Sequence, residues 1–272
     1  MLPEIDWSRA WYDAVRPAFT RLKIDVDIDS GDWIAAFNAC AGELGLHNAS
    51  GQPLRFVPQE ALPEGQAYEQ FIGATGGVPT RANLHDFFNA LVWLTFPRIK
   101  RQLNALQSAQ IALAGVGASR GSSRDAATIF DENAALLVVR DSAAGRALVA
   151  ALRGHRWDEA FCQRREAFGS DAELWLFGHA LMEKLVAPRK AICAHTRVVT
   201  VGDAYFALSP HARRAWIDLH VSAALTSLAP EFEPLTTAGF TPLPVLGVPG
   251  WWPQQDAAFY ADASVFRPKR AG

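Results

Sequence analysis

Polar and aromatic side chains recur along one face of the segment NLHDFFNALVWLTFPRIKRQLN, which spans residues 83–104. At about 100° of rotation per residue, a single helix places them in one sector beside an aliphatic stripe: His85, Asn89, Trp93, Lys100 and Asn104. A neutral imidazole can ligate a metal ion or accept a proton, and Lys100 can bind an anionic group. One hypothesis is that this face forms a wall of an active site, in which His85 is a base or a metal ligand. The alternative is a structural histidine that only donates a hydrogen bond.

The start of this segment has two interpretations. Asn83 followed three residues later by Asp86 is a variant of the capping box, in which both side chains bind free backbone N–H groups at the beginning of a helix. The Asp86 carboxylate could instead act beside His85 in the site. Pro97 removes one backbone hydrogen bond and predicts a kink, which would change the direction of Lys100 relative to His85.

The segment SRDAATIFDEN adds a cation and several carboxylates. Arg124 could bind an anionic group. Asp131 and Glu132, together with His85, could form an oxygen-rich site for a divalent cation such as Mg²⁺, Mn²⁺ or Zn²⁺. The alternative is a solvated polar turn, because two short apolar runs flank these acids and predict a β-hairpin over residues 126–141.

A third pair lies in FGHALMEKL, where His179 and Glu183 are four residues apart and share one face of a predicted helix. This spacing suits a ligand pair or an acid/base pair, and Gly178 permits another backbone to approach closely. The alternative is an ordinary polar pair on a half-exposed helix. His195 alternates with apolar neighbours in a predicted strand, which favours a structural role. The chain contains no Gly-x-Ser-x-Gly elbow, no zinc-ribbon cysteine spacing and no dinucleotide-binding fingerprint.

Around these candidates, the periodicity of apolar residues predicts one α+β domain that is mainly helical, with a small antiparallel β component and an extended C-terminal segment. Strands are expected in LRFVP and KAICAHTRVVTV, and helices over about 143–153, 156–168, 172–187 and from Ser209 and Pro210 onward. The predicted parts are an N-terminal helical pair over about 5–46, a loop-rich stretch over 47–82, a main body over 83–228 and a C-terminal wrap over 229–272, anchored by Trp and Phe side chains.

Composition narrows the class of protein. Half of the 272 residues are hydrophobic and a fifth are charged, as expected for a soluble globular protein. The net charge of -2, with Lys and Arg scattered along the chain, gives no electrostatic reason to expect a nucleic-acid partner. The distant Cys40, Cys162 and Cys193 favour buried reduced thiols. An N-terminus without an apolar run, and the lack of a membrane-spanning stretch, predict a cytoplasmic protein with no membrane partner.

Four long segments occur in a fixed order along the chain: PTRANLHDFFNALVWLTFPRIKRQLN, RDAATIFDENAALLVV, FGHALMEKLVAP and PVLGVPGWWPQQDAAFYADASVFRP. Together they resemble the bacterial proteins grouped as domain of unknown function 3025, over roughly residues 70–268. The resemblance implies a bacterial protein, and it implies no particular activity, fold or cofactor.

The leading hypothesis is a small-molecule hydrolase or a related enzyme, whose site lies between the long helix, the 124–133 segment and the helix at 178–183. The catalytic candidates are His85, Asp86, Asn89, Asp131 and His179; the binding candidates are Arg124, Lys100, Trp93 and Glu183; the metal candidates are His85, Asp131 and Glu132. A non-enzymatic module that binds a ligand or a protein is the alternative, since nine Trp residues are many for this length. Nucleic-acid processing is a third hypothesis, against which the charge balance argues. The oligomeric state is left open.

Two geometric expectations can be checked directly. A single catalytic site requires His85, Asp131 and His179 to lie within about 12 Å of one another. We also expect the apolar stripe of the long helix to be buried, namely Leu84, Phe88, Leu91 and Ile99. The polar face should border a cleft that is partly roofed by the loop GGVPTR, with His85, Asn89 and Lys100 at its edge.

Overall fold

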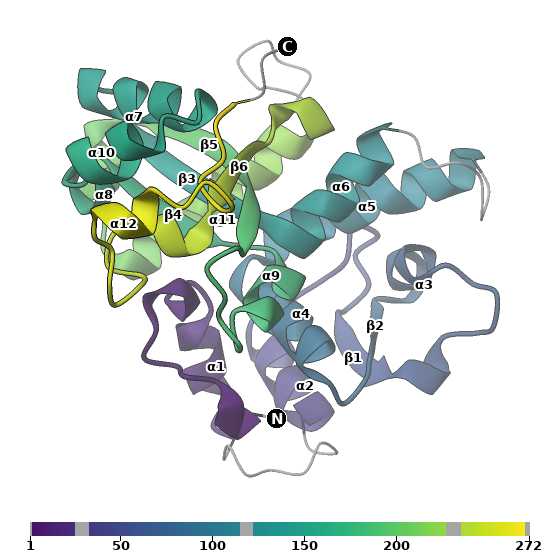
Figure 1. Ribbon diagram of the computed structural model, residues 1–272. Helices are drawn as coiled ribbons and strands as arrows, with labels where there is room; N and C mark the ends of the chain where they lie inside the picture. The colour runs from purple at the N-terminus through teal and green to yellow at the C-terminus, as the bar shows by residue number, and fades with distance from the viewer. Residues whose placement is uncertain (1, 25–32, 115–121, 227–234, 270–272) are drawn as a thin grey trace.

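A computed structural model describes residues 2–24, 33–114, 122–226 and 235–269, and Figure 1 shows how their helices and strands are arranged. Helix accounts for 55% of the described residues and strand for 15%, in two small sheets. The prediction of a mainly helical α+β protein is confirmed. Among the described residues, no helix has the length and apolar character needed to span a bilayer.

The N-terminal half is mainly helical and packs around one apolar helix, α4. In chain order it comprises α1 (Arg16–Leu22), α2 (Trp33–Glu43), β1 (Arg55–Pro58), α3 (Tyr68–Thr75), β2 (Gly77–Thr80), α4 (Leu84–Thr95) and α5 (Pro97–Ala114). β1 and β2 pair in parallel as a two-stranded sheet. The strand predicted in LRFVP corresponds to β1, whereas GGVPTR, predicted as a loop, contributes the buried strand β2.

The rest of the described chain is built on a four-stranded sheet with the order β4-β3-β5-β6. Its elements are α6 (Ser122–Asn133), β3 (Ala134–Arg140), α7 (Ala143–Arg153), α8 (Ala167–Ser170), β4 (Ala172–Leu176), α9 (His179–Lys184), β5 (Cys193–Val201), α10 (Asp203–Phe206), α11 (Pro210–Thr226), β6 (Thr241–Pro244) and α12 (Ala257–Tyr260). β3 and β5 are parallel, and the other two pairs are antiparallel. The sheet is therefore mixed, not purely antiparallel as predicted.

β3 separates two hydrophobic cores. Successive side chains of a strand point to opposite faces, so Leu136 and Val138 join the larger core around α4, whereas Leu137 and Val139 join a smaller one. The C-terminal segment closes the smaller core with buried aromatic side chains such as Phe266. In Figure 1, α7 and α12 lie with the sheet, α1 to α5 form the other part of the molecule, and α9 lies between them.

Two of the predicted elements are wrong. Residues 126–141 are not a hairpin, because α6 continues directly into β3 without a loop. The buried Ala126, Ala127 and Phe130 lie on one face of that helix. The helix predicted over 172–187 is instead β4 followed by the short α9, since residues 172–176 pair with β3.

Several smaller predictions also have an outcome. The helices over 143–153 and from Pro210, and the strand β5, are confirmed. The helix predicted over 156–168 is interrupted by a π-type turn at Glu159–Gln163. All three cysteines are free, but only Cys40 is buried; Cys162 is half-buried and Cys193 is exposed.

The long helix predicted over residues 83–104 breaks at Phe96, where α4 ends and Pro97 begins α5. The backbone N–H groups of Arg98 and Ile99 each donate to the Asp218 carboxylate of α11 over 3.0 Å. Asp218 therefore caps α5 from a different helix, which satisfies donors that a helix start leaves free. This break is the reason that Lys100 of α5 can reach back toward α4.

Candidate functional site

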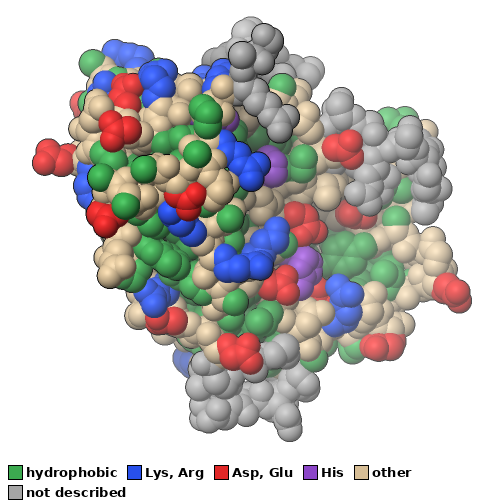
Figure 2. Space-filling model, in the orientation of Figure 1, with side chains coloured by type: hydrophobic (Ala, Val, Ile, Leu, Met, Phe, Trp, Pro, Cys, Tyr) green, Lys and Arg blue, Asp and Glu red, His purple; other side chains and the backbone are tan. Residues whose placement is uncertain are grey.

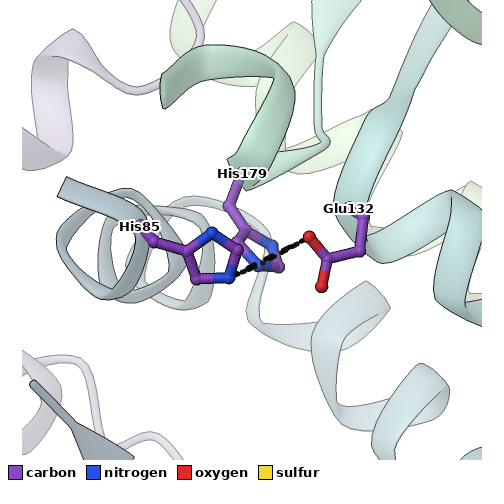
Figure 3. A group of neighbouring side chains, drawn as sticks. All are labelled: His85, Glu132 and His179. Carbon is purple, nitrogen blue, oxygen red and sulfur yellow. Dashed lines mark hydrogen bonds and ion pairs between the residues drawn. The ribbon is translucent and has the colours of Figure 1, made fainter. Parts of the chain in front are cut away.

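Three helices bring two imidazoles and a carboxylate together. His85 lies in the first turn of α4, Glu132 in the last turn of α6 and His179 at the first position of α9, and their side chains point toward one another (Figure 3). The two Nε2 atoms are 3.1 Å apart. Glu132 Oε2 lies 3.5 Å from Nε2 of His179 and 3.9 Å from Nε2 of His85. These three donor atoms form a group that could hold a metal ion.

Of the predicted capping box at the start of α4, the Asn83 cap is present, whereas the Asp86 carboxylate binds Arg81 ahead of the helix. Asn83 Oδ1 accepts a hydrogen bond from the backbone N–H of Asp86 at 2.8 Å. The Asp86 carboxylate in turn accepts from the backbone N–H of Arg81 at 2.7 Å and from its guanidinium group at 2.9 and 3.1 Å. These bonds fix the chain on both sides of the helix start, so they set the position of His85.

Gly178 permits the close approach that brings His179 to Glu132. A Cβ atom at this position would lie 2.5 Å from the backbone nitrogen of Ala134 and 2.6 Å from Cα of Asn133. The backbone N–H of Gly178 donates to the carbonyl of Ala134 at 2.8 Å. The start of α9 is therefore fastened to the junction of α6 and β3, directly beside the residue that carries the carboxylate.

A second carboxylate orients the half-buried His85. Glu183 Oε2 lies 3.0 Å from Nδ1 of His85, so it can accept the proton of that nitrogen. The tautomer with Nδ1–H leaves Nε2 with a free lone pair directed at the group. Metal-binding histidines in proteins almost always make such a contact from the nitrogen that does not bind the metal. His179 and Glu183, which the sequence predicts on one face of a helix, therefore both contact His85.

A buried ion pair lies behind this group. Lys100 Nζ donates to Asp131 Oδ1 at 2.6 Å and to Asn89 Oδ1 at 2.8 Å, and Asn89 donates onward to the Tyr68 hydroxyl at 3.0 Å. Burial alone would raise the pKa of Asp131, but the charge and hydrogen bond of Lys100 act together with the nearby His179 and His85, and the pKa is lowered. The Lys100 ammonium also lies 5.3 Å from the ring centroid of the buried Trp93.

Burial keeps His179 neutral. Its side chain is only 4% exposed, and burial lowers its pKa to about 3, against the opposing influence of the Asp131 charge. A neutral imidazole offers a lone pair, as a metal ligand must. Burial and the negative charge of Asp131 raise the pKa of Glu132. Ionised Glu132 has no cation within the group, so a cation bound beside the neutral His179 would stabilise its charge.

A cavity of about 290 Å³ opens onto the group. One side is formed by the segment that precedes and begins α3, including Gln59, Leu62 and Tyr68, and the other by α4, α5 and α6. The carbonyl of Glu69 accepts hydrogen bonds from Asn104 at 2.9 Å and from Ser108 at 2.6 Å, and these bonds hold the start of α3 against α5. Figure 2 shows histidine, acidic and basic side chains near the centre of the face that is drawn, where α4 and α9 lie in Figure 1.

The roof of the cavity differs from the predicted one. We expected GGVPTR to cover the cleft, but its strand β2 is buried and only Arg81 reaches the cavity wall. Of the apolar stripe, Phe88, Leu91 and Ile99 are fully buried, whereas Leu84 is half-buried. His85 and Asn89 line the cavity as expected, whereas Lys100 is 4% exposed and lies behind its wall.

The structure places most of the predicted site residues around one cavity. His85, Asp86, Asn89, Asp131, Glu132 and His179 all line it. His85 and His179 are in contact, well inside the distance that a single site requires. The Asp131 carboxylate is bonded to Lys100, so the carboxylate that meets both histidines is that of Glu132. The side chain of Arg124 lies outside the described residues.

Sequence reasoning missed several residues of the cavity wall, among them Tyr68 and Gln107. Tyr68 is half-buried at the end of the Lys100 network, and Gln107 is 5% exposed. Tyr68 follows a stretch rich in Pro and Gly, and Gln107 lies past the break at Pro97, so no periodicity links either residue to the histidines.

His195 lies outside this cavity. Asn133 bonds to the Cys193 carbonyl and to His195, both at 3.0 Å, which gives His195 a structural partner.

Comparison with known proteins identifies the family. The family model described as "Protein of unknown function (DUF3025)" matches residues 54–270. The chain belongs to this family. The match covers most of the chain and includes all three residues of the His/carboxylate group, and it confirms the resemblance found in the sequence. No curated protein and no solved structure matches the chain.

Proposed function

We propose that this DUF3025 protein is a metal-dependent hydrolase of small molecules, in which His85, His179 and Glu132 bind one divalent cation. The separations of their donor atoms, 3.1, 3.5 and 3.9 Å, support the proposal. In a tetrahedral zinc site with bonds of about 2.0–2.1 Å, neighbouring donor atoms lie about 3.3 Å apart. Three protein ligands that leave the fourth position open are the arrangement of a catalytic zinc site.

The ligand types favour some cations over others. Imidazole nitrogens suit zinc and other transition metals, whereas Mg²⁺ is bound by oxygen atoms and retains several waters. Zn²⁺ therefore fits this group better than Mg²⁺, and Mn²⁺ is the next choice. A cation here would lower the pKa of a bound water and supply a hydroxide nucleophile near neutral pH. The cavity of about 290 Å³ beside the group would receive a small substrate.

The surrounding residues have separate tasks in this proposal. Glu183 orients His85, and Asp86 fixes the helix start from which His85 projects. Asn89 is held by Lys100 and Tyr68 at the cavity wall, where it would contact the substrate. The argument from tryptophan for a non-enzymatic recognition surface is weaker, because four of the nine Trp side chains are buried and the other five are half-buried against the larger core.

The test is metal binding followed by hydrolysis. The full chain, stripped of metal by a chelator, would be titrated with Zn²⁺, Mn²⁺ and Mg²⁺ by calorimetry and then assayed against a panel of small esters, amides and phosphoesters. Wild type should bind about one Zn²⁺, and His85→Ala, His179→Ala and Glu132→Gln should lose most of that affinity. His211→Ala, at an exposed position on α11, is the matched control and should bind like wild type. Equal zinc binding by wild type and the three site variants would overturn the proposal.

A further inference from the structure

A second, larger cavity of about 680 Å³ lies away from the His/carboxylate group. It runs between α7 and α11 over the second half of β5, and we call it the β5 groove. Its walls consist mainly of valine and alanine side chains together with Arg140, Arg146, Arg153 and Arg197. No carboxylate side chain of the described residues lines it. None of the three proposed metal ligands lies in its wall, so the groove is a separate feature.

The floor of the groove is an open strand edge. β6 pairs with β5 only from Cys193 to Thr196, so Arg197–Val201 has β3 on one side and no strand of the described chain on the other. The backbone N–H of Asp141 donates to the carbonyl of Val201, which directs that peptide group toward β3. Backbone groups alternate in direction along a strand. The N–H and C=O groups of Val198 and Thr200 therefore face the open side.

The two walls of the groove differ in character. α7 contributes Arg146 and Arg153, and α11 contributes Trp216 and His220, whose rings stack with centroids 3.7 Å apart. Arg146 is paired with the exposed Asp141. No ion pair links Arg153 to an acidic residue within the described chain, so its charge is available on the wall. The open edge thus lies between a cationic wall and an aromatic one.

We propose that the β5 groove binds an extended acidic segment of a partner protein, which adds to the sheet beside β5 in line with β6. Addition of a strand supplies main-chain hydrogen bonds, and the walls select the alternating side chains. Five residues of open edge span about 16 Å. Carboxylates on the incoming strand complement the arginine wall. A second copy of this chain fits less well, because edge-to-edge pairing would bring the same arginines of both chains together.

The binding test uses peptides of about eight residues with alternating Glu and Val. A fluorescein-labelled peptide would be titrated with the full chain and followed by fluorescence anisotropy. We expect saturable binding that is weakened about tenfold or more when Lys replaces Glu. Two further peptides carry backbone N-methyl groups, one on the Glu positions and one on the Val positions, and at least one of them should lose binding. If both methylated peptides bind like the parent, or the Lys peptide binds equally well, the proposal is wrong.

Two protein variants separate strand addition from simple anion binding. Arg153→Glu should weaken binding about tenfold or more, whereas Arg55→Glu, at an exposed position on β1, is the matched control and should not. Thr200→Pro removes an N–H group on the open side while the bonds to β3 remain, so it should also lose binding. If Arg153→Glu weakens binding and a folded Thr200→Pro does not, the groove binds anions without adding a strand. If Thr200→Pro does not fold, the methylated peptides decide.

Discussion

At the scale of single residues, the two ring nitrogens of His85 have different surroundings. Nδ1 contacts the Glu183 carboxylate, and Nε2 faces His179 and Glu132. The side chain is still 32% exposed, so it adds little to the core. Phe88, three positions further along α4, is fully buried among other aromatic rings. Neighbouring positions on α4 therefore belong to different environments, one in the proposed metal site and one in the core.

We expect His85→Ala to lose zinc binding. When wild type and variant are both melted in the presence of a chelator, the variant should unfold near the wild-type temperature. Phe88→Ala should instead lower the free energy of unfolding by roughly 3–5 kcal/mol, because it leaves a cavity in the core. Thermal melts and zinc titrations of both variants provide the measurement. A His85→Ala protein that melts as early as Phe88→Ala would show that the histidine has a structural role.

At the scale of helices and strands, the junction between α4 and α5 depends on a carboxylate from α11. Burial raises the pKa of Asp218 to about 6, although two backbone N–H groups favour its charged form. The unfolded value is about 3.9. The folded protein therefore holds the proton more tightly, and Asp218 contributes stability at low pH that is lost as the pH rises from about 4 through 6.

Asp218→Asn should change this pH dependence, because an amide does not titrate. Between pH 4 and pH 7, wild type should lose roughly 2–3 kcal/mol of unfolding free energy relative to the variant. Urea denaturation of both proteins at several pH values measures the difference. A constant gap at every pH would mean that Asp218 keeps an ordinary pKa in the folded protein.

The approach of α9 to the end of α6 allows a second test at this scale. Gly178→Ala places a methyl group 2.5 Å from the nitrogen of Ala134, so α9 must shift and His179 with it. We expect a loss of roughly 1–3 kcal/mol in stability and weaker zinc binding. Gly42→Ala is the control, since a Cβ there meets nothing within 4 Å inside α2. That change should be neutral or stabilise by about 0.5–1 kcal/mol.

The sequence predicted correctly those helices and strands that have a clear apolar periodicity or a recognisable start. α7, β5 and α11 have clear periodicity or a Ser-Pro start, and each forms near its predicted residues. AELWL contains good helix formers, yet it is the strand β4 because it pairs with β3. That pairing joins residues far apart in sequence, which periodicity does not reveal.

The site shows the same limit. The sequence identified His85, Glu132 and His179 as candidates, but it grouped Asp131 with the metal ligands and His179 with the catalytic residues. The difference arises because Lys100 reaches Asp131 from beyond the break at Pro97. A continuous helix would have directed Lys100 elsewhere, so the choice between the two neighbouring acids depends on tertiary structure.

At the scale of the whole molecule, the chain holds two cores on opposite faces of one sheet, and Phe259, Tyr260 and Phe266 of the C-terminal segment complete the smaller one. Phe266 is 5% exposed and packs within 5.5 Å of the ring centroids of Phe259 and Tyr260. The His/carboxylate group is built on helices that border the larger core. Damage to the smaller core should therefore affect stability more than the geometry of the site.

Phe266→Ala should lower the free energy of unfolding by roughly 3–5 kcal/mol and leave zinc affinity near the wild-type value when the protein is folded. Leu113→Ala is the matched control, because that side chain is 89% exposed and should tolerate truncation. Denaturant unfolding and calorimetry measure the two effects. Loss of zinc affinity in folded Phe266→Ala would mean that the two cores are coupled.

The direct passage from α6 into β3 has a consequence for the order of folding. Glu132 stands two residues before a strand whose neighbours, β4 and β5, come from much later in the chain. Pairing between segments so distant in sequence is slow to form. We therefore expect the three proposed ligands to meet late in folding, once these strands have paired. A cation that binds at that stage would stabilise the folded state without speeding its formation, so its effect would appear as slower unfolding.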